Sequence, residues 1–175
     1  MLHRFAAVTL LALAACAPKQ ETAEQMAARL KAESDSARPA IAALSASFAR
    51  NVAAGRADSV ALLYAEDATL MLPNQAPVRG RAAIRAKVAE LIGYGTMQFA
   101  CTMTRLDASG PLAVEQGVCI QNFTPGPGAP AGMAAMFPDT MKYVTAYQKV
   151  NGAWLAIADI SNTIKALRAP GATQR

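Results

Sequence analysis

The stretch KYVTAYQKVNGAWLAIADISNT, residues 142–163, decides the fold, because it reads as two long strands around one tight turn. Asn151-Gly152 is a strong signal for a type I′ hairpin turn, and it separates a strand predicted over 142–150 from one over 154–163. Upstream, residues 97–106 and 112–123 have the same character around a turn near Gly110. The C-terminal half is therefore predicted to be a four-stranded antiparallel meander.

The N-terminal half has helical periodicity instead. A first helix is predicted to begin near Ser36, which can serve as its N-cap, with Pro39 in the first turn. Two further helices follow, separated by one short strand over 68–72. This order indicates an α+β fold in which three N-terminal helices pack against one face of a curved antiparallel sheet. A long, twisted sheet can curl around a helix as a cone with an internal pocket.

Two cysteines of the predicted hairpin are placed to pair. Paired residue numbers in a hairpin have a constant sum, and a turn centred on Gly110 gives a sum of 220. The numbers 101 and 119 also sum to 220, so Cys101 and Cys119 are predicted to face each other on one side of the sheet. We expect a structural disulfide worth about 3 kcal/mol by the chain-entropy model. Two buried free thiols are the alternative.

Residues 1–15 have the build of a secretory signal peptide, with a basic start, an apolar run of 11 residues and small residues before Cys16. The apolar run is too short to span a bilayer as a helix. The ending LAAC (13–16) resembles the lipobox of bacterial lipoproteins, which implies cleavage before Cys16 and a lipid on that residue. An ordinary secretory signal with a chance cysteine is the alternative.

The lipobox resemblance sets the predicted organisation of the chain. Residues 1–15 are the signal peptide, 16–36 the lipidated cysteine and a polar tether, 37–167 the folded domain and 168–175 a frayed tail. We expect a lipid-anchored protein of the cell envelope that faces the periplasm and meets the membrane through Cys16. Ala17 stands where lipoproteins retained at the inner membrane often carry Asp, which favours the outer membrane.

The composition excludes several function classes. His3 is the only histidine and lies in the predicted signal peptide, so the mature chain has no Ser-His-Asp triad and no imidazole zinc site. No metal or other cofactor is expected. The formal charge is +5, but the basic residues are scattered and not interleaved with aromatics, so nucleic acid is not expected as a partner. One local basic group is attributed to a solvated helix face, with an anion site as the alternative: Arg79, Arg81, Arg85 and Lys87.

Six short motifs resemble one family when they are taken in order. They are YAEDA (64–68), VRGRAAI (78–84), GPLAV (110–114), KYV (142–144), NGAW (151–154) and DISN (159–162). Together they resemble the nuclear transport factor 2-like superfamily, which includes ketosteroid isomerases and SnoaL-like polyketide cyclases, and within it the bacterial domain of unknown function 4440 branch. The resemblance covers residues 37–165 and implies a cystatin-like cone.

The chain departs from this family at positions that bear on catalysis. Met141 stands where the family often has Gly, and Ala158 stands near where many members carry His. Catalytic members use a carboxylate inside the cone, and their acid-base set does not map onto this chain residue by residue. The resemblance therefore implies the fold more than an activity, and the sequence favours a binding protein over an enzyme.

Asp159, in the last predicted strand, is the candidate catalytic residue. Strict alternation along the strand places it on one face with Leu155 and Ile157 and opposite to Trp154. If Asp159 faces the cone, a carboxylate with a raised pKa there can take a proton from a carbon next to a carbonyl. If it faces outward, it is a surface acid or part of a dimer face.

Four other residues are candidates for contact with a ligand: Tyr64, Met71, Tyr143 and Trp154. Tyr64 can donate a hydrogen bond into the pocket, and Tyr143 shares a strand face with Thr145 and Tyr147. Trp154 is expected in the core or in the cone wall, and Met71 offers an adaptable apolar surface. Ordinary packing is the alternative for each of them.

Three functions remain open from the sequence. The first is a module that binds a small apolar ligand in the cone. The second is an isomerase- or cyclase-type enzyme that uses a lone carboxylate with a tyrosine in reach. The third is a structural or assembly domain that dimerises through the open face of the sheet, which predicts a filled cone and an apolar outer face.

Overall fold

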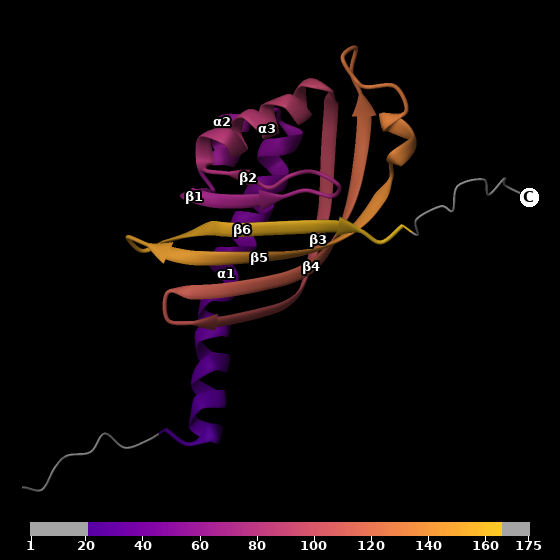
Figure 1. Cartoon of the computed structure of the whole chain (residues 1–175). Coiled ribbons are helices and arrows are strands. Elements are labelled where there is room, and N and C mark those ends of the chain that lie inside the picture. The colour runs from indigo at the N-terminus through magenta and orange to yellow at the C-terminus, as the bar shows by residue number, and fades with distance from the viewer. Residues whose placement is uncertain (1–20, 166–175) are drawn as a thin grey trace, which may run out of the picture.

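The computed structural model describes residues 21–165, and its longest element is helix α1 (Ala23–Ala53; Figure 1). The prediction that this helix begins near Ser36 is wrong. Pro39 lies in the interior of the helix and not in its first turn. A capping box starts it early, because the Thr22 hydroxyl accepts from the Gln25 backbone and the Gln25 side chain accepts from the Thr22 backbone. The predicted signal peptide, Cys16 and the predicted tail lie outside the described residues.

The first half of α1 extends beyond the edge of the sheet, and the second half packs against it (Figure 1). The change falls at Glu33 and Ser34, whose side chains accept hydrogen bonds from the backbone N–H groups of Gly110 and Ala108 at 2.7 and 2.8 Å. Ile41, two residues beyond Pro39, has no exposed surface. Residues 33–34 therefore belong to the folded domain rather than to the predicted tether.

Two shorter helices complete the helical layer. Helix α2 (Ala57–Ala61) and helix α3 (Arg81–Gly93) contact each other, and α3 also contacts strand β1 (Tyr64–Met71). Strand β2 (Val78–Arg79) pairs with β1 at its outer edge. The apolar side of α3 is buried through Ile84 and Val88, which fixes this helix over the sheet.

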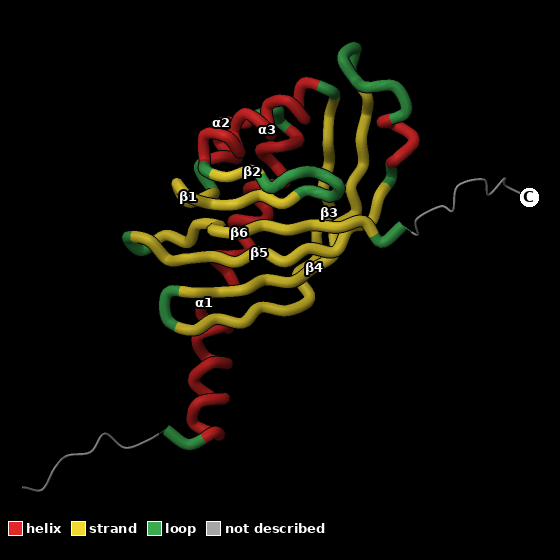
Figure 2. The backbone as a smooth tube through the Cα atoms, in the orientation of Figure 1, coloured by secondary structure: helices red, strands yellow, loops and turns green. Residues whose placement is uncertain are grey.

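The predicted four-stranded meander is present and forms most of the sheet (Figure 2). Its strands are β3 (Gly95–Ser109), β4 (Leu112–Pro125), β5 (Asp139–Val150) and β6 (Ala153–Thr163). The sheet has the order β2-β1-β6-β5-β4-β3, and β1 runs parallel to β6, so it is mixed rather than wholly antiparallel. Asn151 and Gly152 both have positive φ, at 50° and 85°, as a type I′ turn requires.

The pairing of Cys101 with Cys119 is confirmed, and the two residues form a disulfide. The route to this register differs from the prediction. The turn has two residues, so Ser109 pairs with Leu112 and the sum of paired numbers there is 221. A bulge at Thr104, between the pairs that Met103 and Arg105 make, then lowers the sum to 220 before Cys101 is reached.

A second bulge, in β6, overturns the prediction that Asp159 shares a face with Leu155 and Ile157 and lies opposite to Trp154. Tyr147 pairs with Ala156 while Ala146 pairs with Ala158, so Ile157 is an extra residue in the strand. Alternation is therefore interrupted at Ile157. Asp159 lies on the same, helix-facing side of the sheet as the buried residues Trp154 and Ala156, and not opposite to Trp154.

The helices and the concave face of the sheet enclose the hydrophobic core, and one long loop adds to it. The loop from Gly126 to Pro138 contains a short 3₁₀ helix, η1 (Met133–Met136). Phe137 of this loop packs against Phe123 with the ring centroids 5.1 Å apart. Over the described residues, no helix is both long enough and apolar enough to cross a membrane.

Candidate functional site

A cavity of about 550 Å³ lies between α1, α3 and the concave face of the sheet. Its walls are mainly apolar and come from every layer of the fold, with Leu44 and Phe48 from α1, Val88 from α3, and Leu70 and Phe99 from the sheet. Residues of η1 and the turn at 73–75 border it as well. The cone is therefore not filled by side chains, and its volume is in the range of small-molecule sites.

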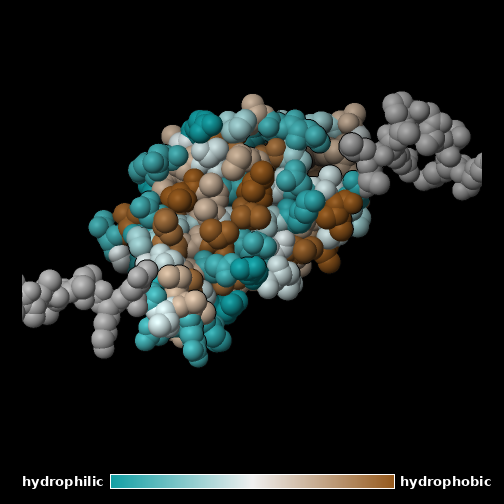
Figure 3. All heavy atoms as spheres, turned by 60° about the horizontal axis from the view of Figure 1, so that its bottom comes forward, coloured by the Kyte–Doolittle hydropathy of each residue, from teal (hydrophilic) through white to brown (hydrophobic). Residues whose placement is uncertain are grey.

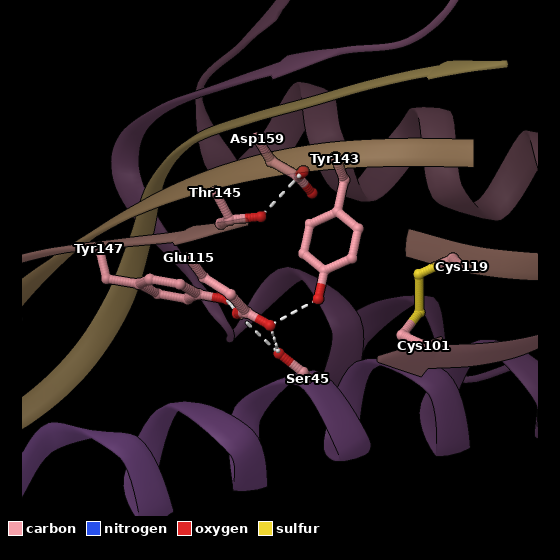
Figure 4. Close-up of a disulfide and its surroundings, with 8 residues drawn as sticks. All are labelled: Ser45, Cys101, Glu115, Cys119, Tyr143, Thr145, Tyr147 and Asp159. Carbon is pink, nitrogen blue, oxygen red and sulfur yellow. Dashed lines mark hydrogen bonds between the residues drawn. A yellow bond between two sulfur atoms is a disulfide. The ribbon is translucent and has the colours of Figure 1, made fainter. Parts of the chain in front are cut away.

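A row of polar side chains crosses the concave face of three neighbouring strands (Figure 4). Thr145 of β5 pairs with Asp159 of β6 on one side and with Glu115 of β4 on the other. Because adjacent strands are about 4.8 Å apart, the backbones of Asp159 and Glu115 lie roughly 10 Å apart across the sheet, with Thr145 between them. The row is thus a product of sheet register and not of sequence proximity.

Asp159 borders the cavity and is held by two hydroxyl groups. The Tyr64 hydroxyl donates to one carboxylate oxygen at 2.8 Å and the Thr145 hydroxyl donates to the other at 3.2 Å. Asp159 lies deep in the protein but keeps some accessible surface, because it borders the cavity. Burial raises the pKa of Asp159, and the hydrogen bonds from Tyr64 and Thr145 partly oppose that rise.

Glu115 lies behind the cavity wall and has no exposed surface. Its carboxylate accepts from the hydroxyls of Tyr143 at 2.6 Å and Tyr147 at 2.7 Å, and from Ser45 of α1 at 3.0 Å (Figure 4). Burial and the neighbouring carboxylate raise the pKa of both tyrosines, so their hydroxyls stay protonated and donate. A buried carboxylate needs such partners, and here three donors from two elements supply them.

Gly117 makes room for this arrangement. It pairs with Tyr143 across β4 and β5, and a Cβ atom at position 117 would overlap the Tyr143 phenol and the Thr102 carbonyl oxygen. The absence of a side chain therefore lets the Tyr143 ring lie over the strand and reach Glu115.

The structure places two of the four predicted ligand-contacting residues at the cavity. Tyr64 and Tyr143 line it, and Asp159, the candidate acid, lines it between them in the polar row. Trp154 is 8% exposed and lies in the hydrophobic core, and Lys149 stands over its ring. Met71 does not border the cavity, because Leu70 and Leu72 on either side of it face inward.

Sequence reasoning missed Glu115 and Ser45. A signal for Glu115 was present, because strand alternation places it on the same face as Cys119, and cysteine is among the residue types most often buried. No signal pointed to Ser45, whose partner is 70 residues away.

Three members of the local basic group form ion pairs with neighbouring acids, and Arg79 lies in β2 rather than in the helix. Arg81 pairs with Glu66, Arg85 with Asp58 and Lys87 with Glu90, and none of these basic side chains lines the cavity. Within residues 21–165, no group of three or more His, Cys, Asp or Glu side chains is arranged to hold a metal ion.

Comparisons with known proteins place the fold. A family model described as a SnoaL-like domain matches residues 33–158. A search of curated proteins finds no significant match. An NTF2-like protein with a cystatin-like fold from Novosphingobium aromaticivorans superposes with a TM-score of 0.61 at 17% identity, covering 84% of this chain and 93% of that one.

Two further solved structures have names that refer to an activity. A putative scytalone dehydratase from Novosphingobium aromaticivorans has a TM-score of 0.64 and 16% identity, covering 82% of this chain and 99% of its own. A ketosteroid isomerase-like protein from Erwinia carotovora atroseptica has a TM-score of 0.63 and 14% identity, covering 73% of this chain and 96% of its own. At these identities the likeness shows the fold alone.

Proposed function

The chain belongs to the SnoaL-like domain family, and from this premise we propose that it binds a small, largely apolar molecule in its cavity. The observation that carries the proposal is a cavity of about 550 Å³ whose mainly apolar walls carry the Asp159 carboxylate. Apolar walls bind the body of a ligand, and a few fixed polar groups set its orientation. Asp159 has its own orientation fixed by Tyr64 and Thr145, so it is the group that would meet the ligand's polar end.

Binding can be tested by filling the cavity from one strand position and using the next position as a control. Ser161 of β6 borders the cavity, and its neighbour Asn162 is exposed on the other face of the sheet. We expect thermal shifts of the full-length protein across a panel of apolar metabolites to identify at least one ligand. The Ser161→Phe variant should lose that shift and Asn162→Phe should keep it. A flat panel with the unchanged protein would contradict the proposal.

A second candidate function is proton transfer, favoured by the raised pKa of Asp159 at the cavity wall. A buried carboxylate of this kind is a stronger base than an exposed one and can take a proton from a carbon next to a carbonyl. Structural neighbours named as a putative scytalone dehydratase and as a ketosteroid isomerase-like protein are consistent with this class. Asp159→Asn should then abolish turnover of a bound ligand without preventing its binding, as measured by product formation and by calorimetry. Equal turnover by the variant would exclude Asp159 as the base.

We further propose that the protein is anchored in the cell envelope, at the outer membrane, through lipid on Cys16. The support is the signal-like segment at 1–15 and its lipobox-like ending. Cys16→Ala should abolish acylation and move the protein out of the membrane fraction. A variant that still sediments with membranes would refute the anchor.

We also propose that two copies associate through the outer face of the sheet. Five exposed apolar side chains on three adjacent strands form what is here called the convex patch: Val114, Val118, Ile120, Val144 and Ile160. Apolar side chains also gather between polar ones in the view of Figure 3. Patches of this kind mark interaction sites, and a two-fold dimer is the commonest way to cover one. A purely structural role is less well supported, because it also predicted a filled cone.

A further inference from the structure

Several hydroxyl groups lie in or beside the polar row, and all of them except that of Ser161 donate their proton to a carboxylate. Tyr64 and Thr145 donate to Asp159, and Tyr143 and Tyr147 donate to Glu115. A hydroxyl has a single proton to donate and lone pairs with which to accept. These four groups therefore offer acceptor lone pairs to anything that enters the cavity.

The acidic side chains at the cavity also favour a ligand that donates hydrogen bonds. Glu115 accepts three hydrogen bonds and donates none, which is the pattern of a carboxylate, and Asp159 also only accepts. Among the described residues that line the cavity, the one basic side chain is Lys165, and its ammonium group is bonded to the Met136 carbonyl oxygen. Asp159 thus faces a mainly apolar space, with the buried Glu115 behind the wall, and no basic side chain is paired with either acid among the described residues. An incoming positive charge or hydrogen-bond donor is strongly attracted to such a place.

Ser161 is the exception in the row, and it lies beside Asp159. The residue is 9% exposed and borders the cavity, and its hydroxyl makes no hydrogen bond with another described residue. It follows Asp159 by two positions on the same strand face and pairs with Tyr143 across the strands. Among the described residues no side-chain oxygen or nitrogen that lacks accessible surface is without a partner, so the Ser161 oxygen is accessible from the cavity. Its hydroxyl is therefore free to bind a ligand that enters there.

We propose that the polar end of the ligand is a hydrogen-bond donor, an amine first and a hydroxyl second, held by Asp159 and Ser161. The inference rests on the proposed binding function and narrows its ligand class. An ammonium group donates to Asp159, to Ser161 and to the Tyr143 oxygen, and it compensates the buried negative charge. A hydroxyl donates to Asp159 and accepts from Ser161. A ketone finds a donor only in Ser161 and meets Asp159 unfavourably, and a carboxylate adds a further negative charge beside Asp159.

The test uses four ligands with one apolar body and different heads: naphthylmethylamine, naphthylmethanol, acetonaphthone and naphthoate, all substituted at the same ring position. Calorimetry with the full-length protein should give the order amine, alcohol, ketone, naphthoate, with the amine at least about tenfold tighter than the ketone. A ketone or naphthoate that binds as tightly as the amine would overturn the donor preference while leaving the binding function intact. If none of the four binds, the binding function fails and the inference fails with it.

Two matched variants locate the preference. Asp159→Asn should reduce the advantage of the amine over the ketone by about tenfold and leave naphthylmethanol binding within about threefold. Asp139→Asn removes a second acid that borders the cavity, on β5, and it should leave the order of the four ligands unchanged. Loss of the preference in Asp139→Asn alone would overturn the assignment to Asp159. Should Asp159→Asn not fold, the four-ligand series on the unchanged protein still decides.

Discussion

The two faces of the central sheet carry the reverse of the usual distribution of polarity. The concave face is buried, yet it holds Glu115, which is fully buried, and Asp159. The convex face is open, yet Ile120 on it is 49% exposed and Val144 is 41% exposed. Glu115 and the exposed Val114 are consecutive residues of β4, so strand alternation alone separates the two environments.

The difference between the two faces identifies features of the sheet that the stability of the fold does not explain. Moving a carboxylate out of water costs several kcal/mol and is recovered only through good partners, and an apolar interior of similar volume is often more stable. The concave row therefore indicates a site. Exposed apolar side chains are ordinary when scattered, but several of them gathered on three adjacent strands indicate a surface that is covered.

The largest expected effect comes from removing the buried acid of the concave face. Glu115→Leu leaves the hydroxyls of Tyr143, Tyr147 and Ser45 without their acceptor, so the free energy of unfolding should fall by about 3 kcal/mol or more. The control is Thr124→Leu, an exposed residue of the same strand outside the convex patch, which should change stability by less than about 0.5 kcal/mol. Urea denaturation followed by circular dichroism measures both. Equal losses would remove the distinction between the faces.

A smaller loss is expected where the concave face is most crowded. Gly117→Ala places a methyl group against the Tyr143 phenol and should cost about 1–3 kcal/mol, as overpacking does. Gly93→Ala, at the end of α3, meets no atom within 4 Å and should be neutral or slightly stabilising. Thermal melts of the two variants test this directly. If Gly117→Ala melts like the unchanged protein, Tyr143 is not held by close contact.

Much of the sheet was predictable because local rules determine it. The Asn151-Gly152 turn fixes one hairpin, and the pairing of Cys101 with Cys119 was predicted correctly from residue numbers. That success needed two compensating departures, a shorter turn than assumed and a bulge at Thr104. A bulge adds one residue without a distinctive sequence signal, so strict alternation cannot reveal it.

The same limit explains the errors at the site. In β6 the bulge at Ile157 has no second departure to offset it, so the prediction that Asp159 lies opposite to Trp154 was wrong. Glu115 was overlooked because a lone glutamate in a strand is usually exposed, and the partners that allow its burial are 28 to 70 residues away. Residues that act through long-range register are therefore the part of a site that a single sequence conceals.

The pH dependence of stability gives a finer test of the concave face. Burial raises the pKa of Asp159 above its ordinary value of 3.8. The folded state then binds this proton more strongly, so the stability it contributes is fully present below pH 3.8 and is lost as the pH rises through the folded pKa. The free energy of unfolding of the unchanged protein minus that of Asp159→Asn should fall with rising pH, by at most about 1.4 kcal/mol per pH unit.

Taking the difference between the two proteins removes opposing contributions from the surface. A hydrogen bond from the Gly110 backbone lowers the pKa of Glu33, and one from Lys31 lowers the pKa of Asp35. The stability that these two groups contribute to the protein is therefore lost as the pH falls. Both proteins contain them, and they cancel. A difference that rises with pH would mean that Asp159 is stabilised as the anion, contrary to the role of burial argued above.

The smallest effect on stability, and the clearest on assembly, is expected from the convex patch. Val144 pairs with Ile160 and lies at the centre of the patch, so Val144→Lys places a charge where two copies would meet. A monomer loses little by it, less than about 0.5 kcal/mol, because the side chain is already exposed. Association requires the charge to be desolvated, so light scattering should show a dimer for the unchanged protein and a monomer for the variant. Ala89→Lys adds the same charge on an exposed position of α3 and should remain dimeric. A monomeric unchanged protein would refute association through the convex patch, and the contrast between the two faces would then rest on the concave site alone.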